Sequence, residues 1–169
     1  CLNIVHETIV LVFSLSDESD ALARKLRAEV KKLFVCHSVA QALTLLEKHN
    51  SDPDVPGIGL IIADWARDSV PLLEALHVRE TAPETMHLPF ILTILMTPEG
   101  DMHMAKQDNA VRSVAKIELL QSAPSKTVFD NIIEIVRQNT VIEGTYKDLR
   151  RSKRNVRYPF LPIFVSDAR

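Results

Sequence analysis

The chain has 169 residues, of which 46% are hydrophobic and 25% are charged, and its formal net charge is -2 at pH 7. This length and apolar content suit one domain of ordinary size with a buried core. The near-neutral charge excludes a general electrostatic attraction to nucleic acid or to an anionic membrane, so any such contact would be local.

Two cysteines, Cys1 and Cys36, are too few for a disulfide framework. The sequence shows no signal peptide and no apolar run of membrane-spanning length. We therefore expect a reducing, cytoplasmic setting. Because the first residue is Cys and not Met, we also expect the chain to be a segment of a longer polypeptide with neighbouring domains.

Apolar runs of strand length alternate along the chain with segments of helical periodicity. We predict five units, each a strand followed by a helix. The first three have strands at 8–13, 33–36 and 58–63, and their helices run from 17 to 30 or 31, from 38 to 48, and from about 69. The fourth has a strand from 90 to 95 or 96 and a weaker helix from 101 to about 111, and the fifth has a strand at 114–120 and a helix from 127. These units predict an α/β fold: a doubly wound, five-stranded parallel sheet in flavodoxin-like order, followed by an extended C-terminal tail.

Local signals support the individual elements. The run "TIVLVF" at 8–13 is apolar and rich in β-branched residues, as expected of a strand covered on both faces. Hydroxyl side chains at 14 and 16 precede an acidic first turn, which suits the N-terminus of a helix. In the helix from 127, apolar residues recur at i, i+3, i+4 and i+7.

Asp64 ends the predicted third strand, and the chain's single tryptophan, Trp65, follows it. In a doubly wound sheet, ligands bind outside the carboxyl ends of the strands, so we place Asp64 at the functional edge. Several motifs for that edge are missing from the sequence: it has no G-x-G-x-x-G, no P-loop, no Cys or His pair with zinc spacing and no G-x-S-x-G after a strand. Nucleotide binding and ordinary hydrolase or dehydrogenase activity are therefore not indicated.

The order of these elements, with an acid ending the third strand, resembles the receiver domain of two-component response regulators over about residues 8–138. The stretch "SVAQALTLLEKH" at 38–49 resembles the second helix of that family. The stretch "GLIIADWARDSVPLLEALHVRE" at 59–80 resembles its third strand, phosphoacceptor and third helix.

The resemblance implies a receiver-like domain at residues 1–140. It implies that Asp64 matches the phosphoacceptor, and that Thr97, or Thr93 in a shifted register, matches the switch hydroxyl at the end of the fourth strand. In that family, partners commonly contact the face made by the fourth helix, fifth strand and fifth helix.

The sequence departs from the family at the magnesium site. Receivers hold magnesium with adjacent acids directly after the first strand, where this chain has Ser14 and Leu15. The nearest acids, Asp17 and Glu18, fall inside the predicted helix. The family's lysine, which precedes a proline, is missing from "LQSAP" at 120–124.

A carboxylate without a metal to neutralise the incoming phosphoryl group is a poor acceptor. We therefore interpret the chain as a degenerate receiver, or pseudo-receiver: a non-catalytic module without a cofactor, acting in protein interaction, dimerisation or regulation within a larger signalling protein. The alternative is a phosphorylatable receiver in a phosphorelay. In that hypothesis Asp64 accepts the phosphoryl group, Asp17 and Glu18 help to bind magnesium, and Thr97 acts as the switch.

Two further groups of side chains have a structural and a functional interpretation. Trp65 is either a partly buried packing residue or an anchor for a partner. All four methionines lie between Met86 and Met104. They either fill gaps and form an adaptable protein-binding surface or, with the histidines beside them, supply soft-metal ligands.

Residues 141–169 are predicted to form a basic and then apolar tail or linker. Six cations of this tail lie within eleven residues: Lys147, Arg150, Arg151, Lys153, Arg154 and Arg157. They favour a solvated linker over a contact with nucleic acid or lipid. The stretch "YPFLPIFV" at 158–165 is too apolar to remain in water, so we expect Tyr158, Phe160 and Phe164 to pack on this domain, on a second copy or on a partner protein.

Overall fold

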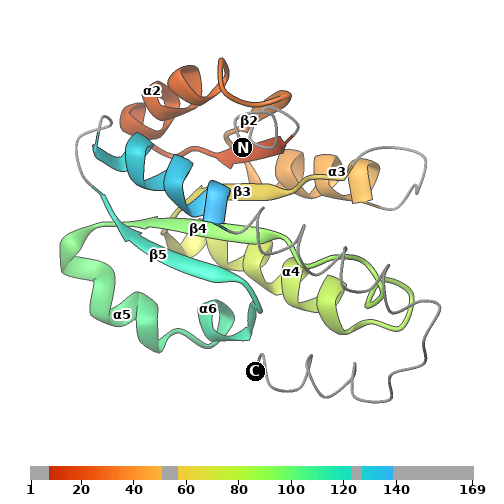
Figure 1. Ribbon diagram of the computed structural model, residues 1–169. Helices are drawn as coiled ribbons and strands as arrows, with labels where there is room; N and C mark the ends of the chain where they lie inside the picture. Colours follow the sequence, from red (N-terminus) through yellow and green to blue (C-terminus); the bar gives the residue numbers. More distant parts are fainter. Residues whose placement is uncertain (1–7, 51–56, 123–126, 139–169) are drawn as a thin grey trace.

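The computed structural model describes residues 8–50, 57–122 and 127–138 (Figure 1). Its centre is a five-stranded parallel sheet in the order β2-β1-β3-β4-β5. The strands are β1 (Ile9–Phe13), β2 (Lys32–Cys36), β3 (Leu60–Asp64), β4 (Leu92–Thr97) and β5 (Ile117–Gln121). This order confirms the predicted doubly wound, flavodoxin-like sheet.

Helices cover both faces of the sheet. On one face lie α2 (Asp17–Leu26) and the helix at 127–138, and on the other lie α3 (Val39–Asn50), α4 (Val70–Thr81) and α6 (Asn109–Ser113) (Figure 1). Strand side chains alternate between the two cores because successive residues point to opposite faces. Thus Val10 and Val12 pack with α2, whereas Leu11 and Phe13 pack with α3 and α4.

The central strands are apolar because they are covered on both faces. Every residue of β1 and β4 is buried, and β3 is buried up to Ala63. The edge strands are less buried, and β5 has no fully buried residue. Asp64 is the last residue of β3 and is half-buried. The sheet therefore presents Asp64 at its carboxyl edge, where the sequence placed it.

The predicted strand starts at 90 and 114 were too early. Phe90 is 43% exposed, and β4 begins only at Leu92, where the backbone pairs with Leu60 of β3. Val114 is the C-cap of α6 and donates its N–H to the Val111 carbonyl, at 3.4 Å. Both residues are apolar, but they lie outside the stretch in which a neighbouring strand is available for pairing.

The first helix is shorter than predicted, because α2 ends at Leu26 and not at residue 30 or 31. The Glu29 N–H donates to the Leu26 carbonyl at 2.8 Å. The Lys31 N–H donates to the Thr8 carbonyl at 3.0 Å, and this second hydrogen bond brings the chain back to the sheet. Val30 is only 8% exposed and joins the same core as α2. The apolar spacing therefore predicted its burial correctly but not its backbone conformation.

The helix predicted from 101 to 111 is divided into the 3₁₀ turn η2 (Glu99–Asp101), α5 (Met102–Gln107) and α6. Asp108 has an extended backbone and caps α6, since its carboxylate accepts from the N–H groups of Ala110 at 2.8 Å and Val111 at 3.4 Å. A side chain that satisfies free N–H groups in this way starts a new helix and ends the earlier one. A similar turn, η1 (Arg67–Ser69), leads into α4.

Within the described part of the chain, no helix is long and apolar enough to cross a membrane. The predictions for Cys1, for the tail at 141–169 and for its residues Tyr158, Phe160 and Phe164 lie outside the described residues.

The core makes a direct prediction about stability. Ile94 in β4 is fully buried, so Ile94→Ala should lower the free energy of unfolding by about 2–5 kcal/mol. Met104→Ala, at a side chain that is 60% exposed, should change it by less than about 0.5 kcal/mol. Urea unfolding followed by circular dichroism measures both. Equal losses in the two variants would contradict the described core.

Candidate functional site

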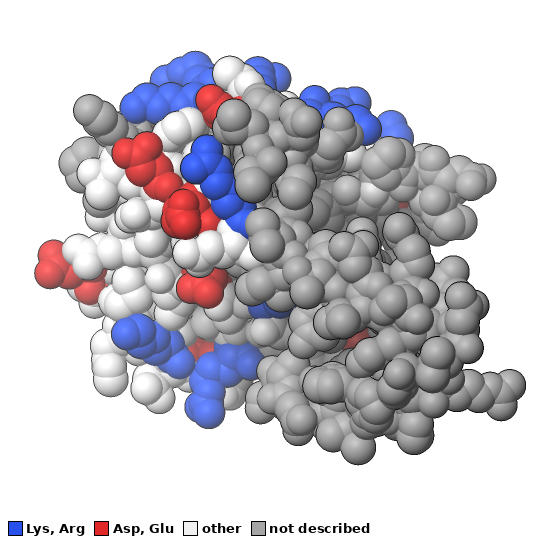
Figure 2. All heavy atoms as spheres, in the orientation of Figure 1, with Lys and Arg blue, Asp and Glu red and all other residues white. Residues whose placement is uncertain are grey.

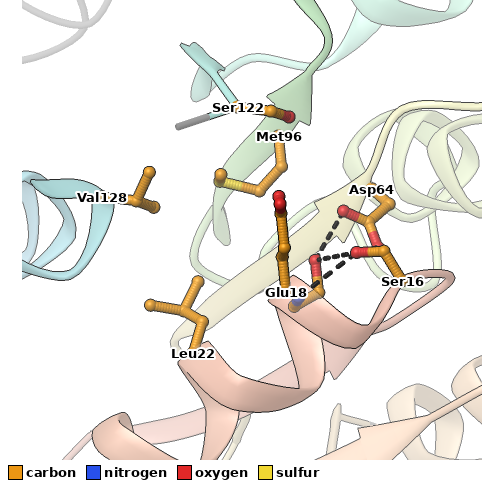
Figure 3. A pocket seen from close by; sticks show the side chains of 8 residues that line it. Ser16, Glu18, Leu22, Asp64, Met96, Ser122 and Val128 are labelled. Carbon is orange, nitrogen blue, oxygen red and sulfur yellow. Dashed lines mark hydrogen bonds between the residues drawn. The ribbon is translucent and has the colours of Figure 1, made fainter. Parts of the chain in front are cut away.

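The carboxyl ends of the strands enclose a small crevice around Asp64 (Figure 3). It is lined by Ser16, Glu18, Ser19, Leu22, Asp64, Met96, Ser122 and Val128. These residues come from the start of α2, the ends of β3 and β4, the residue after β5, and the helix at 127–138. The crevice has a volume of about 20 Å³, which is room for about one water molecule.

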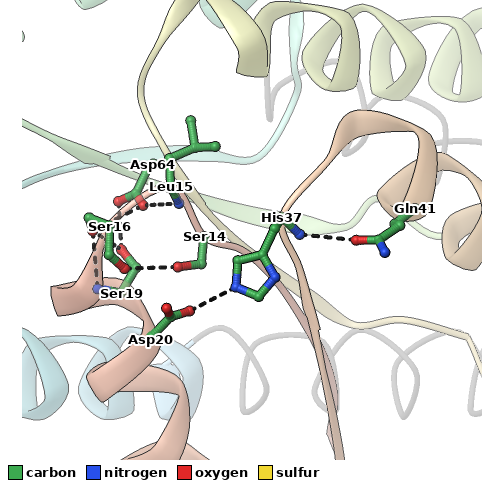
Figure 4. A network of polar contacts seen from close by, with 8 residues as sticks. All are labelled: Ser14, Leu15, Ser16, Ser19, Asp20, His37, Gln41 and Asp64. Carbon is green, nitrogen blue, oxygen red and sulfur yellow. Dashed lines mark hydrogen bonds and ion pairs between the residues drawn. The ribbon is translucent and has the colours of Figure 1, made fainter.

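Both oxygens of the Asp64 carboxylate accept hydrogen bonds from the loop and helix start that follow β1 (Figure 4). Asp64 Oδ2 accepts from the Leu15 N–H at 2.7 Å and from the Ser16 hydroxyl at 3.2 Å. Asp64 Oδ1 accepts from the Ser19 hydroxyl at 2.6 Å. The carboxylate is therefore partnered by donors of the protein itself, and we call this set of contacts the Asp64 clamp.

The local sequence builds the clamp around the start of α2. Ser16 is the N-cap of that helix, and its hydroxyl oxygen accepts from the Ser19 N–H at 3.2 Å. Ser14 is buried and donates its hydroxyl to the Ser16 carbonyl at 3.0 Å, which closes the turn. Small hydroxyl side chains can satisfy both the helix terminus and a neighbouring acid in so tight a turn.

A second acid, Asp20, extends the polar network toward β2 (Figure 4). Its carboxylate lies 3.1 Å from Nε2 of His37, the residue that follows β2. The Ser14 hydroxyl, and then the His37 imidazole, hold the pKa of Asp20 below its ordinary value of 3.8.

The residues around Asp64 do not fit the magnesium site of a receiver. Magnesium takes oxygen ligands in near-octahedral geometry, but the first two positions after β1 hold a buried Ser14 and an apolar Leu15. Asp17 and Glu18 are exposed in the first turn of α2, and Glu18 lines the crevice. Among residues 8–50, 57–122 and 127–138, no group of three or more His, Cys, Asp or Glu side chains is placed to hold a metal.

The two candidate switch hydroxyls lie at different levels of β4. Thr97 ends the strand, whereas Thr93 pairs with Ile61 inside the sheet. Both are fully buried, and the Thr97 hydroxyl donates to the Leu95 carbonyl at 3.2 Å. Only Thr97 therefore lies at the carboxyl edge beside the crevice, and its role as a switch stays a prediction.

The end of β5 carries Gln121 and Ser122 where receivers have their lysine. The Ser122 N–H donates to the Thr97 carbonyl at 2.8 Å, so this end of the strand is attached to β4. Residues 123–126 lie outside the described residues.

Trp65 is half-buried and packs against the core on the α3 and α4 face. The backbone N–H of Trp65 donates to the Met96 carbonyl at 2.8 Å. The methionines lie on three parts of the chain: Met96 is buried in β4, Met86 lies before that strand, and Met102 and Met104 lie in α5. A partner-binding role for Trp65 stays a prediction.

The sequence did not reveal which side chains hold Asp64. Ser16 and Ser19 lie 48 and 45 positions before it, and only the pairing of β1 with β3 brings them to it. The available signal was the hydroxyl-rich stretch "SLSDES" directly after the first strand. This stretch predicts helix capping, which is correct for Ser16 but does not include the contacts with Asp64.

Comparisons with known proteins agree with the fold. No protein-family model matches this chain, and no curated protein matches its sequence. The structure of an adenylate cyclase from Rhodopirellula baltica matches 86% of this chain and 98% of that chain, with 17% identity and a TM-score of 0.57. The Legionella pneumophila response regulator LqsR matches 87% of this chain and 48% of that chain, with 16% identity and a TM-score of 0.55. At these identities the likeness shows the fold alone, which is receiver-like.

The clamp predicts a stability role for Asp64. Asp64→Asn keeps the size of the side chain but replaces one acceptor oxygen with a donor, so at least one donor of the loop loses its partner. The free energy of unfolding should fall by about 1–3 kcal/mol. Asp68→Asn, at an exposed acid of η1, is the matched control and should change it by less than about 0.5 kcal/mol. Urea unfolding that gives the two variants the same stability would rule out the clamp.

The Asp20 network predicts a pKa change. Ser14→Ala removes the largest cause of the lowered value, so the pKa of Asp20 should rise toward 3.8, as measured by NMR titration of its carboxyl carbon. Because the pKa of Asp20 is lower in the folded than in the unfolded state, Asp20 stabilises the fold above about pH 3.8. This contribution is lost as the pH falls through the folded-state pKa.

Ser38→Ala serves as the control for the NMR titration. An unchanged Asp20 titration in Ser14→Ala would contradict the role of Ser14 in lowering the pKa of Asp20.

Proposed function

We propose that this chain is a pseudo-receiver, a non-catalytic module that acts through protein interaction within a larger signalling protein. The observation that carries the proposal is the Asp64 clamp, in which one backbone N–H and two hydroxyls occupy the carboxylate. The receiver-like fold supports the signalling context.

Phosphoryl transfer to Asp64 would require a free lone pair aligned with the phosphorus atom and cations to neutralise the transferred group. Here each carboxylate oxygen already accepts at least one hydrogen bond, which makes it a weaker nucleophile. Glu18 lines the same crevice and adds a second negative charge to it. Both features disfavour an incoming phosphoryl group.

We infer that the interaction surface of the module includes β5 and the helices beside it. β5 is an edge strand, half-exposed along its length, with α5 and α6 before it and the helix at 127–138 after it (Figure 1). This is the face through which the receiver family commonly contacts its partners. Other domains of the parent protein, a signalling partner or a second copy of the chain are the expected occupants.

The alternative is a working phosphoacceptor in a phosphorelay. The position of Asp64 favours it, since the side chain is half-exposed at the carboxyl end of β3, with Thr97 ending the neighbouring strand. This function requires the clamp to open and magnesium to bind at Asp64 with Asp17 and Glu18.

Trp65, the residue after Asp64, provides the test. Its fluorescence should show no saturable change when magnesium and then beryllium fluoride are titrated in, and a small phosphodonor should leave Asp64 unlabelled. An active receiver that carries a tryptophan beside its acceptor is the positive control. A saturable change, or labelling, that is present in the parent and absent in Asp64→Asn would establish the phosphoacceptor instead.

A further inference from the structure

Three large apolar side chains are exposed close together in the sequence, at the end of α4 and in the connection to β4. Val78 is 59% exposed, Met86 is 58% exposed and Phe90 is 43% exposed. A single exposed apolar residue is ordinary, and we take these three, which all lie between Val78 and Phe90, as the candidate docking surface. We call these three residues the α4-end surface.

Hydrogen bonds fix the backbone that carries this surface. The Thr85 hydroxyl donates to the Arg79 carbonyl at 2.7 Å, and an Arg79 guanidinium N–H donates to the Pro89 carbonyl at 2.7 Å. The Met86 N–H donates to the Ala82 carbonyl at 2.8 Å. A ligand that docks here therefore meets a connection that is already ordered, which lowers the entropy cost of binding.

The topology places the α4-end surface far from the Asp64 crevice. The helix α4 starts near the carboxyl edge of the sheet, where β3 ends, and returns to the opposite edge, where β4 begins at Leu92 (Figure 1). The helix at 127–138 follows β5 and returns in the same direction, so Gln138 ends at this same edge. The chain that follows Gln138 thus starts at the edge that carries the exposed surface.

The sequence after Gln138 contains a segment that needs apolar cover. The stretch "YPFLPIFV" at 158–165 has three aromatic and three aliphatic side chains and no charge. Pro159 and Pro162 disfavour a helix and favour an extended conformation. Such a segment presents its rings on a stiff backbone, which suits a shallow surface of methionine and phenylalanine.

The connecting chain is long enough. About 20 residues separate Gln138 from Tyr158, and a flexible chain of that length spans roughly 25 Å on average and up to about 66 Å when extended. A folded domain of this size has a radius of gyration of about 14 Å, so either face of the amino edge is within reach. A tether of this length also gives the segment a high effective concentration at the surface.

We propose that the segment Tyr158–Val165 docks on the α4-end surface of its own chain. The docked segment covers Val78, Met86 and Phe90 and leaves the β5 face and the Asp64 crevice open. The basic run at 147–157 then forms the solvated connection.

Two equally exposed methionines make a direct test possible. Met86 is 58% exposed in the α4-end surface, and Met104 is 60% exposed on α5, away from it. The full chain is labelled with ¹³C-methyl methionine, and its methyl spectrum is compared with that of Phe160→Ser/Phe164→Ser. The loss of two aromatic rings should move the Met86 signal and leave the Met104 signal in place. Val156→Ser, just outside the segment, is the matched control and should move neither.

Each other outcome overturns the proposal. An unchanged Met86 signal places the segment elsewhere, and equal changes at Met86 and Met104 mean that the substitutions disturb the whole domain. A Met86 shift that appears only at high protein concentration assigns the segment to the surface of a second copy.

Limited proteolysis gives an independent measurement on the same full chain. Chymotrypsin cleaves after the aromatic residues of the segment only when it is released, so the cleavage rate follows the released fraction. Met86→Ser/Phe90→Ser should raise this rate about tenfold if the segment is docked for about nine-tenths of the time. Met104→Ser should leave the rate unchanged, and an equal rate in both variants would reject the docked segment.

Discussion

The hydrogen bonds between the Asp64 carboxylate and the start of α2 connect three parts of the molecule. They attach the end of β3 to the loop after β1 and to the first turn of α2, through Leu15, Ser16 and Ser19. Because the acceptor carries a full charge, such bonds are about twice as strong as those between neutral groups. The shape of this loop, the cap of α2 and the chemistry left to Asp64 all depend on this one interaction.

In the proposed function, a carboxylate that is held by its own protein has a structural role, and the module acts elsewhere. The carboxyl edge of the sheet offers a crevice of about 20 Å³, and two exposed surfaces lie away from it. One is the half-exposed edge strand β5, and the other is the α4-end surface at the opposite edge of the sheet. Under the proposed function, the module acts through the partners that cover these surfaces, without chemical modification of Asp64.

Local patterns predicted the sheet well, because a buried parallel strand is apolar throughout and an amphipathic helix repeats at a fixed spacing. They failed where one side chain or one pairing partner decides the outcome. Asp108 caps a new helix inside the segment for which the sequence predicts a single weaker helix, and Val114 lies before the first paired residue of β5. The position of Asp64 could be predicted, but its hydroxyl partners could not, because they are separated from it by more than 40 positions and only the fold brings them together.

The amide of Leu15 gives the most direct test of the clamp. The residue is 42% exposed, and its N–H donates to Asp64 Oδ2 at 2.7 Å, so this bond should protect the amide from exchange with solvent. Hydrogen exchange of Leu15, followed by NMR in the parent and in Asp64→Ala, with and without magnesium, measures it. The clamp predicts slow exchange in the parent, unchanged by magnesium, and fast exchange in Asp64→Ala. Fast exchange in the parent, or protection that magnesium removes, would show that the carboxylate is free to take a metal and a phosphoryl group.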